Sequence, residues 1–304
     1  MNKKFSSYLL IVLIAMLFIP GIASVISQRN IISDTLAFRT LEKIKETTRF
    51  NKRNKGNKTR NENKINSRNV IVPPFSSVVN SNHNYPIGRF LTGNETTIGV
   101  CTASVINTAN GNIGLTAAHC LIDRDGKQYN LSFLSFSPGY DTETNGPLGA
   151  IPVEDVAIPY THLVDPREND YALVRFAFKD PNRGGARLQD YTGALGWRFD
   201  IGNNEPTCVF CYPVGGNLED CIRDSKHLCK WQGITKKRQN FYVIRKVDLG
   251  YAASGSPYIS QYDTETNLGY AYTLMTRYIN TSEVSVGKIW DENVFFGLLL
   301  RLTS

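Results

Sequence analysis

Acidic residues are scarce at the start of this 304-residue sequence, and a basic excess is missing from the rest of it. Residues 1–70 contain 4 Asp and Glu against 14 Lys and Arg, whereas residues 71–304 contain 23 acidic and 20 basic residues. The net charge of +7 therefore belongs to the N-terminal region. The remainder needs no acidic partner, so we expect it to bind no nucleic acid.

Long stretches with the 3.6-residue period of an amphipathic helix are also few, and no internal repeat stands out. From Val70 onwards, short β-branched and apolar runs alternate with Gly, Pro and Asn. The length suffices for a sizeable core. The pattern predicts an all-β protein of two packed, six-stranded-type Greek-key β-barrels. Strands are predicted at 70–72, 98–101, 104–106, 113–115, 172–176 and 241–244.

The first 23 residues have the composition of a secretory signal peptide. Lys3 and Lys4 precede an apolar run from Tyr8 to Ile19, and small residues around Ala23 offer a cleavage site. An uncleaved membrane anchor is the alternative, because apolar residues resume shortly after that run. Cleavage predicts a secreted, extracellular protein with no stable membrane association.

Residues 24–69 are basic and rich in Asn, with few apolar side chains. Such a segment cannot bury enough surface to offset the entropy of ordering, so it is predicted to be disordered. It is either a solvated linker or a pro-segment of a zymogen, cut around Arg60–Arg68. Residues 70–304 are then the folded domain.

Six cysteines behind a secretory signal predict disulfides. The four at Cys208, Cys211, Cys221 and Cys229 allow three pairings, which the sequence does not resolve. The Cys-x-x-Cys spacing of the first two also occurs in zinc sites, although secretion favours disulfides over a metal. Sequons typical of a secreted glycoprotein occur at Asn57, Asn94, Asn130 and Asn280.

Three segments carry residues suited to nucleophilic catalysis. Ser254 lies among small residues in Gly250–Ile259, which permit a tight turn and leave amides free to face an oxyanion. His119 follows Leu-Thr-Ala-Ala, and Asp170 precedes the predicted strand at 172–176. A serine hydroxyl needs a base to take its proton, and the base needs a carboxylate to fix its tautomer. The remaining histidines lack such surroundings and are interpreted as structural: His83, His162 and His227.

Through Thr116–Cys120, Asn169–Leu173 and Ser254–Pro257, in the order His, Asp, Ser, the chain resembles the trypsin-fold (chymotrypsin-like) serine proteases. The resemblance covers essentially the whole expected mature chain. It implies an active site between the two barrels and a serine endopeptidase that acts on protein or peptide substrates, with no metal or organic cofactor. It also implies a disulfide between Cys101 and Cys120.

The resemblance assigns roles to individual residues. His119 is the general base, Asp170 orients it, Ser254 is the nucleophile, and the amides of Ala252 and Ser254 form the oxyanion hole. The family usually has glycine where this chain has Ala252, and alanine restricts the backbone. If the loop cannot aim that amide, the rate falls on the order of 100-fold or more. The alternative function is therefore a catalytically inactive, protease-fold binding or decoy protein.

Further departures bear on specificity. Ala253 stands where animal trypsins have the aspartate of their activation ion pair, so the chain looks more similar to the glutamyl-endopeptidase-like branch. In that branch a histidine helps to bind the substrate carboxylate, and Tyr272 is the corresponding residue here. Asp248 lies where a trypsin-like pocket places its carboxylate for Lys or Arg. It is either a specificity group or a structural residue.

Overall fold

A computed structural model describes residues 70–142 and 144–303, which lie within the unit Asn63–Ser304. The predicted signal peptide (1–23) and the pro-segment or linker (24–69) fall outside the described residues. Among the helices that the structure describes, none has both the length and the apolar character needed to cross a membrane.

Six antiparallel strands close into a barrel in the order β2-β3-β4-β7-β6-β5. Apolar side chains fill its interior, where the rings of Phe136 and Phe176 stack with centroids 4.6 Å apart. Gly114 makes room for this pair, because a Cβ there would lie 2.4 Å from the Phe176 ring. The strands are β2 (Ile87–Gly93), β3 (Ile98–Val105), β4 (Ile113–Thr116), β5 (Ser135–Pro138), β6 (Ile151–Ala157) and β7 (Ala172–Phe176).

Nine strands form a second sheet, in the order β1-β8-β13-β12-β9-β10-β11-β15-β14. All neighbours are antiparallel except β8 and β13. The sheet curls back on itself, because Thr276 N donates to Val286 O at 2.9 Å just beyond the end of β13. The strands are β1 (Ile71–Val72), β8 (Gly196–Arg198), β9 (Glu205–Cys211), β10 (Cys229–Arg238), β11 (Phe241–Arg245), β12 (Pro257–Asp263), β13 (Leu268–Leu274), β14 (Arg277–Ile279) and β15 (Val284–Lys288).

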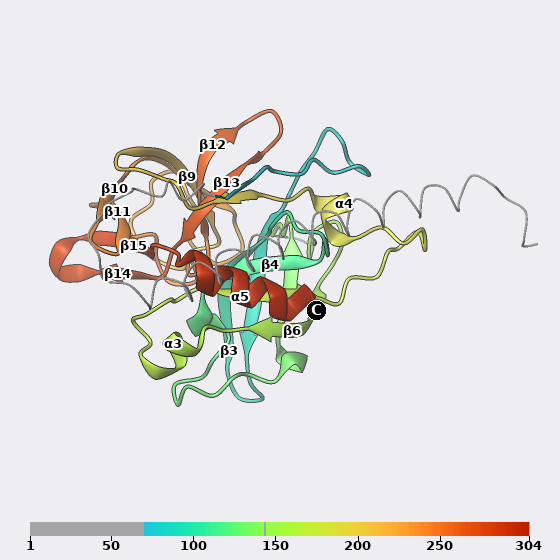
Figure 1. Cartoon of the computed structure of the whole chain (residues 1–304), viewed down its shortest axis with the longest axis horizontal. Coiled ribbons are helices and arrows are strands. Elements are labelled where there is room, and N and C mark those ends of the chain that lie inside the picture. The colour runs from blue at the N-terminus through green and yellow to red at the C-terminus, as the bar shows by residue number, and fades with distance from the viewer. Residues whose placement is uncertain (1–69, 143, 304) are drawn as a thin grey trace, which may run out of the picture. The chain divides into compact units, whose positions relative to one another are not determined.

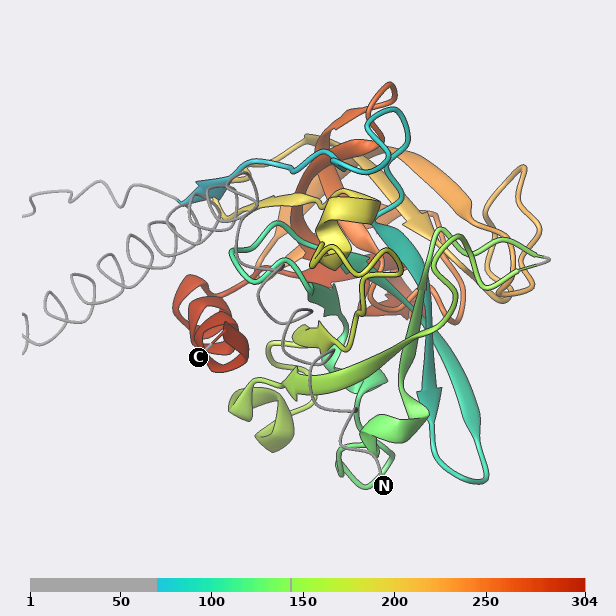
Figure 2. The ribbon, with the colours of Figure 1, turned by 90° about the vertical axis from the view of Figure 1, so that its right-hand side faces the viewer.

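The predicted all-β architecture of two halves is confirmed. Each predicted strand overlaps an observed one, but those predicted at 98–101 and 104–106 form a single strand, β3. The first half closes fully, as expected. The second half has nine strands rather than six, since short strands extend it at both edges. Figure 1 shows the barrel strands β3, β4 and β6 below β12 and β13 of the second sheet, and Figure 2 shows the same two halves from the side.

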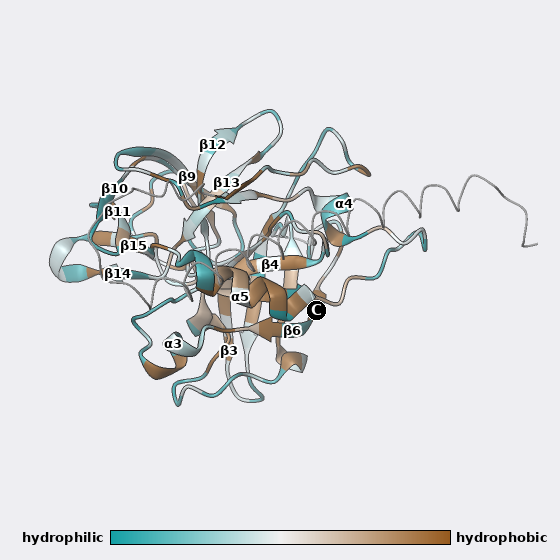
Figure 3. Cartoon of the chain, viewed as in Figure 1, coloured by the Kyte–Doolittle hydropathy of each residue, from teal (hydrophilic) through white to brown (hydrophobic). Residues whose placement is uncertain are grey.

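The longest described helix is α5 (Glu292–Thr303), which packs on β6 and β7. Asp291 caps it, since its Oδ1 accepts a hydrogen bond from Val294 N at 3.0 Å. Its buried residues recur at helical spacing: Phe295, Leu298, Leu299 and Leu302. Figure 3 shows that most of α5 is hydrophobic. The other helical turns are short: η1 (Ala118–Cys120), η2 (Leu131–Phe133), α3 (Tyr160–Val164), α4 (Leu188–Thr192) and η3 (Asn280–Ser282).

The cysteines form two disulfides in the described chain. Cys101 on β3 is bonded to Cys120 at the end of η1, and Cys221 is bonded to Cys229. The other two, Cys208 and Cys211 on β9, are buried and unpaired, so the expectation that they form disulfides is wrong. Three residues apart on one strand, they point to opposite faces of the sheet and cannot meet. The same geometry argues against a shared zinc ion.

Three of the four sequons lie in the described residues, and their asparagines are exposed: Asn94, Asn130 and Asn280. Asn57 lies outside the described residues. Glycosylation of these sites stays a prediction.

The loop that carries Ser254 precedes β12 of the second sheet but docks on β3 of the barrel. Thr102 N donates to Ser254 O at 2.8 Å, and Thr102 Oγ1 donates to Ala252 O at 3.2 Å. Gly255 lies so close to the barrel that a Cβ there would stand 2.5 Å from Thr116 Oγ1. Close backbone contacts at this loop are therefore part of the seam between the two halves.

We predict that Gly255→Ala lowers the free energy of unfolding by about 2–4 kcal/mol, because the added methyl group collides with β3 and β4. Gly126→Ala is the matched control. Its φ of +78° resembles the +87° of Gly255, but a Cβ there meets nothing within 4 Å. Gly126→Ala should lower the free energy of unfolding by only about 1 kcal/mol, because alanine is strained at a positive φ. Equal losses for both variants in denaturant titrations would contradict a tightly packed seam.

Candidate active site

The structure brings His119 and Asp170 together. His119 follows β4 and Asp170 precedes β7, and these strands are paired, with Thr116 opposite Ala172. His119 Nδ1 lies 2.9 Å from Asp170 Oδ2, and the His119 amide donates to Oδ1 at 3.1 Å. The Asp170 side chain is 8% exposed, whereas that of His119 is 38% exposed. The carboxylate thus holds one nitrogen of the ring.

The electrostatics of this pair favour an imidazolium beside a carboxylate. Burial opposes the charged form of His119, but the charge and hydrogen bond of Asp170 outweigh it, so the pKa of His119 is raised from its ordinary value. The guanidinium of Arg277 acts in the opposite direction and lowers that pKa. Burial also opposes the charge on Asp170, yet His119 overcomes it and lowers the pKa of the carboxyl group.

Ser254 lies on a loop anchored beside this pair. Gly255, the next residue, packs against Thr116 and Ala117, which immediately precede the turn that carries His119. Within the described residues, no hydrogen bond joins the Ser254 hydroxyl to His119. Catalytic hydrogen bonds are often long or unformed in the absence of substrate.

The backbone around the nucleophile leaves donors unused. Gly255 N donates to Met275 O at 2.8 Å and Tyr251 N donates to Val214 O at 2.9 Å. Ala252 and Ser254 lie between these two residues, and none of the described residues accepts a hydrogen bond from either amide. Ala252 has a φ of +64°, in the left-handed region where glycine is favoured. Alanine has therefore adopted a conformation that costs about 1–2 kcal/mol.

The two pocket candidates have different surroundings. Tyr272 is buried in the second sheet, where its hydroxyl lies 2.6 Å from Thr207 Oγ1 and 2.8 Å from Thr235 Oγ1. Burial raises its pKa well above the ordinary value, so the hydroxyl stays neutral. Asp248 accepts a hydrogen bond from Gly250 N at 2.9 Å through Oδ1, which fixes its own turn. Burial raises the pKa of Tyr278 on β14, and the nearby negative charge of Asp248 raises it further.

Several residues at the site carry no sequence signal of their own. Thr102 anchors the Ser254 loop, and Lys288 Nζ binds Glu168 Oε2 at 2.7 Å, two residues before Asp170. His162, interpreted as structural, lies with Nε2 3.9 Å from Asp170 Oδ1. The first two contacts join segments far apart in the chain, and the third lies within no recognisable motif, so composition and spacing did not predict them.

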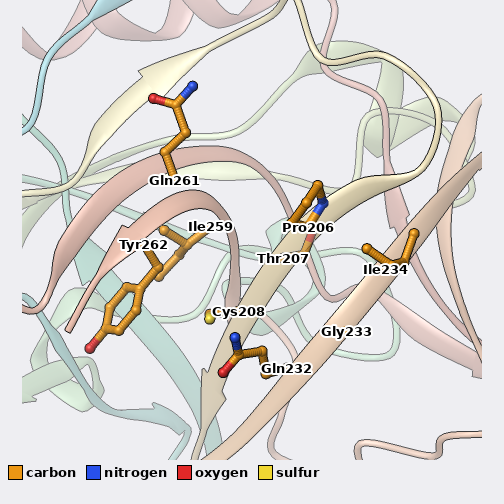
Figure 4. Close-up of a pocket in the computed structure, with 9 residues that line it drawn as sticks. All are labelled: Pro206, Thr207, Cys208, Gln232, Gly233, Ile234, Ile259, Gln261 and Tyr262. Carbon is orange, nitrogen blue, oxygen red and sulfur yellow. The ribbon is translucent and has the colours of Figure 1, made fainter.

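A metal is not supported at this place. The sulfurs of Cys101 and Cys120 lie within 4.8 Å of a ring nitrogen of His119, but they are bonded to each other. A hollow of about 300 Å³ opens elsewhere, between β9, β10 and β12, with the Cys208 sulfur inside it (Figure 4). It is lined by none of His119, Asp170 and Ser254.

A β protein with a closed six-stranded barrel, a second sheet and an Asp–His pair beside their seam belongs to a recognisable structural class. The chain is similar to the thermostable serine protease AL20 of an extremophilic microorganism (20% identity, 73% of this chain and 99% of that one, TM-score 0.59). It is similar to the protease Anisep of Arthrobacter nicotinovorans (18%, 73% and 98%, TM-score 0.60) and to a Glu endopeptidase (15%, 77% and 100%, TM-score 0.51).

These similarities show that the chain has the trypsin-like serine-protease fold, as the sequence motifs predict. No family model and no curated protein sequence matches the chain.

We predict that Arg277→Gln raises the pKa of His119, because it removes a cation that disfavours the imidazolium. The wild-type pKa should already exceed the ordinary value of 6.5. An NMR titration of the ring protons in Ser254→Ala protein, which avoids self-cleavage, measures both values. Arg183→Gln, at an exposed turn, is the control and should leave the pKa unchanged. A lower pKa in Arg277→Gln would contradict the assignment.

We predict that Ala252→Gly increases the free energy of unfolding by about 0.5–1 kcal/mol, because glycine adopts a positive φ without strain. Ala253→Gly, in the neighbouring buried position without a positive φ, should instead destabilise the protein by about 1 kcal/mol. Denaturant titration of both variants checks the expectation. A loss of stability in Ala252→Gly would show that the turn is not strained.

Proposed function

We propose that the protein is a secreted serine endopeptidase that hydrolyses peptide bonds through His119, Asp170 and Ser254. The observation that carries the proposal is the Asp170 carboxylate on Nδ1 of His119, beside the anchored Ser254 loop. In the trypsin-like fold these three residue types act together as base, orienting carboxylate and nucleophile.

In the proposed reaction, His119 removes the proton from the Ser254 hydroxyl, which attacks the peptide carbonyl carbon. The negative charge that develops on the carbonyl oxygen is met by the unused amides of Ala252 and Ser254. His119 then protonates the leaving amine, and an acyl-enzyme remains on Ser254. Water, activated by the same imidazole, hydrolyses this ester. Asp170 stays ionised and stabilises the imidazolium in both steps.

Protein or peptide chains are the proposed substrates because of the edge strand beside the nucleophile. β14 lies at the end of the second sheet and pairs only with β15 among the described strands. It follows Met275, whose carbonyl anchors Gly255. An exposed edge can add an extended peptide as a further strand. We propose Asp248, whose charge acts on Tyr278 of β14, as a group that contacts the side chain of such a substrate.

Tyr272 has its hydroxyl occupied by two threonines, which supports a structural role for it rather than a substrate contact. Secretion is proposed from the leader-like sequence at 1–23, together with two disulfides of the kind that persist in oxidising compartments. Removal of 24–69 as a pro-segment belongs to the same proposal.

The alternative is a binding or decoy protein that keeps the fold without turnover. The observation that favours it is that, among the described residues, the hydrogen bonds of the His119 ring go to Asp170 and none goes to Ser254. The two functions differ in whether Ser254 attacks an electrophile. They predict opposite results for a reactive phosphonate.

We predict that an alkyl fluorophosphonate labels the secreted, folded protein and that Ser254→Ala abolishes the labelling. Ser256→Ala is the matched control, since that hydroxyl lies two residues away and is buried. It should leave the labelling in place. Asp170→Asn should slow labelling by a factor on the order of 10³–10⁴, because the ring loses its orienting carboxylate. Folded protein that takes up no label would favour the decoy.

A further inference from the structure

Basic residues gather on one part of the second sheet. The neighbouring strands β10, β11, β15 and β14 lie side by side in Figure 1, and together they contain seven Lys and Arg residues and no Asp or Glu. Residues 71–304 as a whole contain slightly more acidic than basic residues. The near balance of charge in the domain therefore conceals a local separation.

The register of these strands places most of the cations on one side of the sheet, because directly opposite residues of antiparallel strands point to the same side. One row across the four strands consists of Arg277, Val286, Val243 and Lys236. The next row along the strands consists of Lys288, Phe241 and Arg238. The row on the other side consists of Ile279, Val284 and Arg245. We call this side the basic face, after its cations: Arg277, Lys288, Arg245, Lys236 and Arg238.

The opposite side of the same strands belongs to the core. Tyr242, which alternates with the residues of the basic face along β11, is buried. Tyr278 follows Arg277 and so points to that side as well. Burial raises the pKa of Tyr278, and the charges of Asp248 and Glu283 raise it further. The basic face is therefore the outer side of the sheet, and these two carboxylates act on a side chain of the inner one.

Four cations of the basic face form no ion pair with a carboxylate of the described residues. Three of them are exposed: Lys236, Arg238 and Arg245. The fourth, Arg277, is half-buried. The fifth cation, Lys288, binds Glu168. Neighbouring like charges repel one another, and an acidic ligand would relieve this repulsion.

The basic face also offers apolar contact. The ring of Phe241 has two cations against it, with the Arg277 guanidinium carbon 5.3 Å and Lys288 Nζ 5.1 Å from the ring centroid. Ile279 and Val284 lie opposite each other on the same face and are partly exposed. A polypeptide with both acidic and apolar side chains fits such a surface better than a uniform polyanion does.

The basic face begins beside the proposed active site. Gly255 N donates to the carbonyl oxygen of Met275, two residues before Arg277 on β14. The charge of Arg277 reaches His119 and lowers the pKa of that ring. Because β14 leads away from the Ser254 loop, a peptide paired with it in the antiparallel sense runs toward Ser254. The residues that precede the cleaved bond would then pass the basic face.

The size of the basic face suits a short segment of chain. Neighbouring strands of a sheet are about 4.8 Å apart, so β14 and β10 are separated by about 14 Å. About five extended residues cover that distance. A segment that leaves the edge of β14 and crosses the face can therefore meet Arg277 at one side and Lys236 at the other.

We propose that the basic face is an accessory binding surface for an acidic segment of a protein substrate, and that this segment precedes the bond that is cut. The role in cleavage rests on the proposed function, whereas the affinity for an acidic peptide does not. Residues 1–70 of this chain, with 14 basic and 4 acidic residues, have the same sign of charge as the face, which disfavours them as its occupant.

The first test measures binding to the full chain with Ser254→Ala, which cannot cut the probe. The probe is a fluorescein-labelled peptide of about ten residues in which Glu alternates with apolar residues, and the reference peptide has Gln in place of Glu. Fluorescence anisotropy should show that the Glu peptide binds about 10-fold more tightly at about 0.05 M salt, and that the difference disappears near 1 M salt, where charges are screened. Equal affinities at low salt would overturn the proposal.

The second test locates the binding on the chain. Lys236→Gln with Arg238→Gln removes two exposed cations of the basic face and should weaken binding of the Glu peptide about 3- to 10-fold. Arg277 stays unchanged, because its charge also acts on His119.

Arg124→Gln with Lys127→Gln is the matched control, since both residues are exposed in a turn of the barrel half. It should change the affinity by less than about twofold. Residues 1–70 are basic in every variant, so only the comparison between the two double variants assigns the binding to the face. A Glu peptide that binds both equally well would show the proposal to be wrong.

A sulfated polysaccharide is another polyanion that a basic surface can bind. A heparin fragment is therefore tested as a competitor of the labelled Glu peptide and, separately, for direct binding. If heparin bound and lost affinity in Lys236→Gln with Arg238→Gln, whereas the Glu peptide did not bind, the partner would be a polysaccharide and the proposal would fail.

A third measurement separates this proposal from the proposed function. With Ser254 intact, two peptide libraries with the same randomised positions compete for the protein, one preceded by a Glu-rich segment and the other by a Gln-rich segment. The Glu library should be cut about 3- to 10-fold faster, and Lys236→Gln with Arg238→Gln should bring the ratio close to one. If nothing were cut or labelled by the fluorophosphonate but the variants still changed peptide binding, the surface would stand and the endopeptidase would not. Cleavage at equal rates would refute the accessory surface alone.

Discussion

The negative charge of a buried carboxylate must be balanced by the groups around it. The buried Asp170 side chain makes this a requirement for the barrel. Burial alone would raise its pKa, and His119 reverses this by charge and by hydrogen bonding. The ring is brought into place by the pairing of β4 with β7, and the disulfide between Cys101 and Cys120 fixes the turn that carries it. The barrel thus supplies a rigid Asp–His pair before any substrate is present.

Much of this arrangement could be predicted from local sequence. The strand positions follow from β-branched runs between Gly, Pro and Asn, and the residues around His119, Asp170 and Ser254 match motifs whose chemistry requires them. Cys101–Cys120, which the resemblance implied, is present. The strand positions are confirmed because each depends on a few neighbouring residues, whereas the disulfide was predicted only through the resemblance.

The remainder depends on contacts that no short window contains. The unpaired state of Cys208 and Cys211 is decided by the faces of β9, not by the even number of cysteines. The surroundings of Tyr272 are set by Thr207 and Thr235 on other strands. His162 was a lone histidine in the sequence, and only the fold places it on Asp170.

Ala252 shows how a departure from a family pattern can be absorbed. Sequence alone raised the question of whether alanine permits the turn before the nucleophile. The chain takes up the left-handed conformation with alanine in place, at a cost of about 1–2 kcal/mol. The contacts of Thr102 with Ala252 O and Ser254 O hold the loop on both sides of the strained residue. A strained backbone conformation can persist where contacts on both sides hold the residue in it.

The two halves of the molecule fix the site by reciprocal contacts. Thr102, in the barrel, binds the backbone of the Ser254 loop, which belongs to the second sheet. Lys288, in the second sheet, is 7% exposed and binds Glu168, which belongs to the barrel and leads into Asp170. A shift of one half against the other would break a backbone hydrogen bond at the nucleophile and strand a buried cation near the carboxylate. The relative position of Ser254 and the Asp–His pair is therefore set by the seam itself rather than by either half alone.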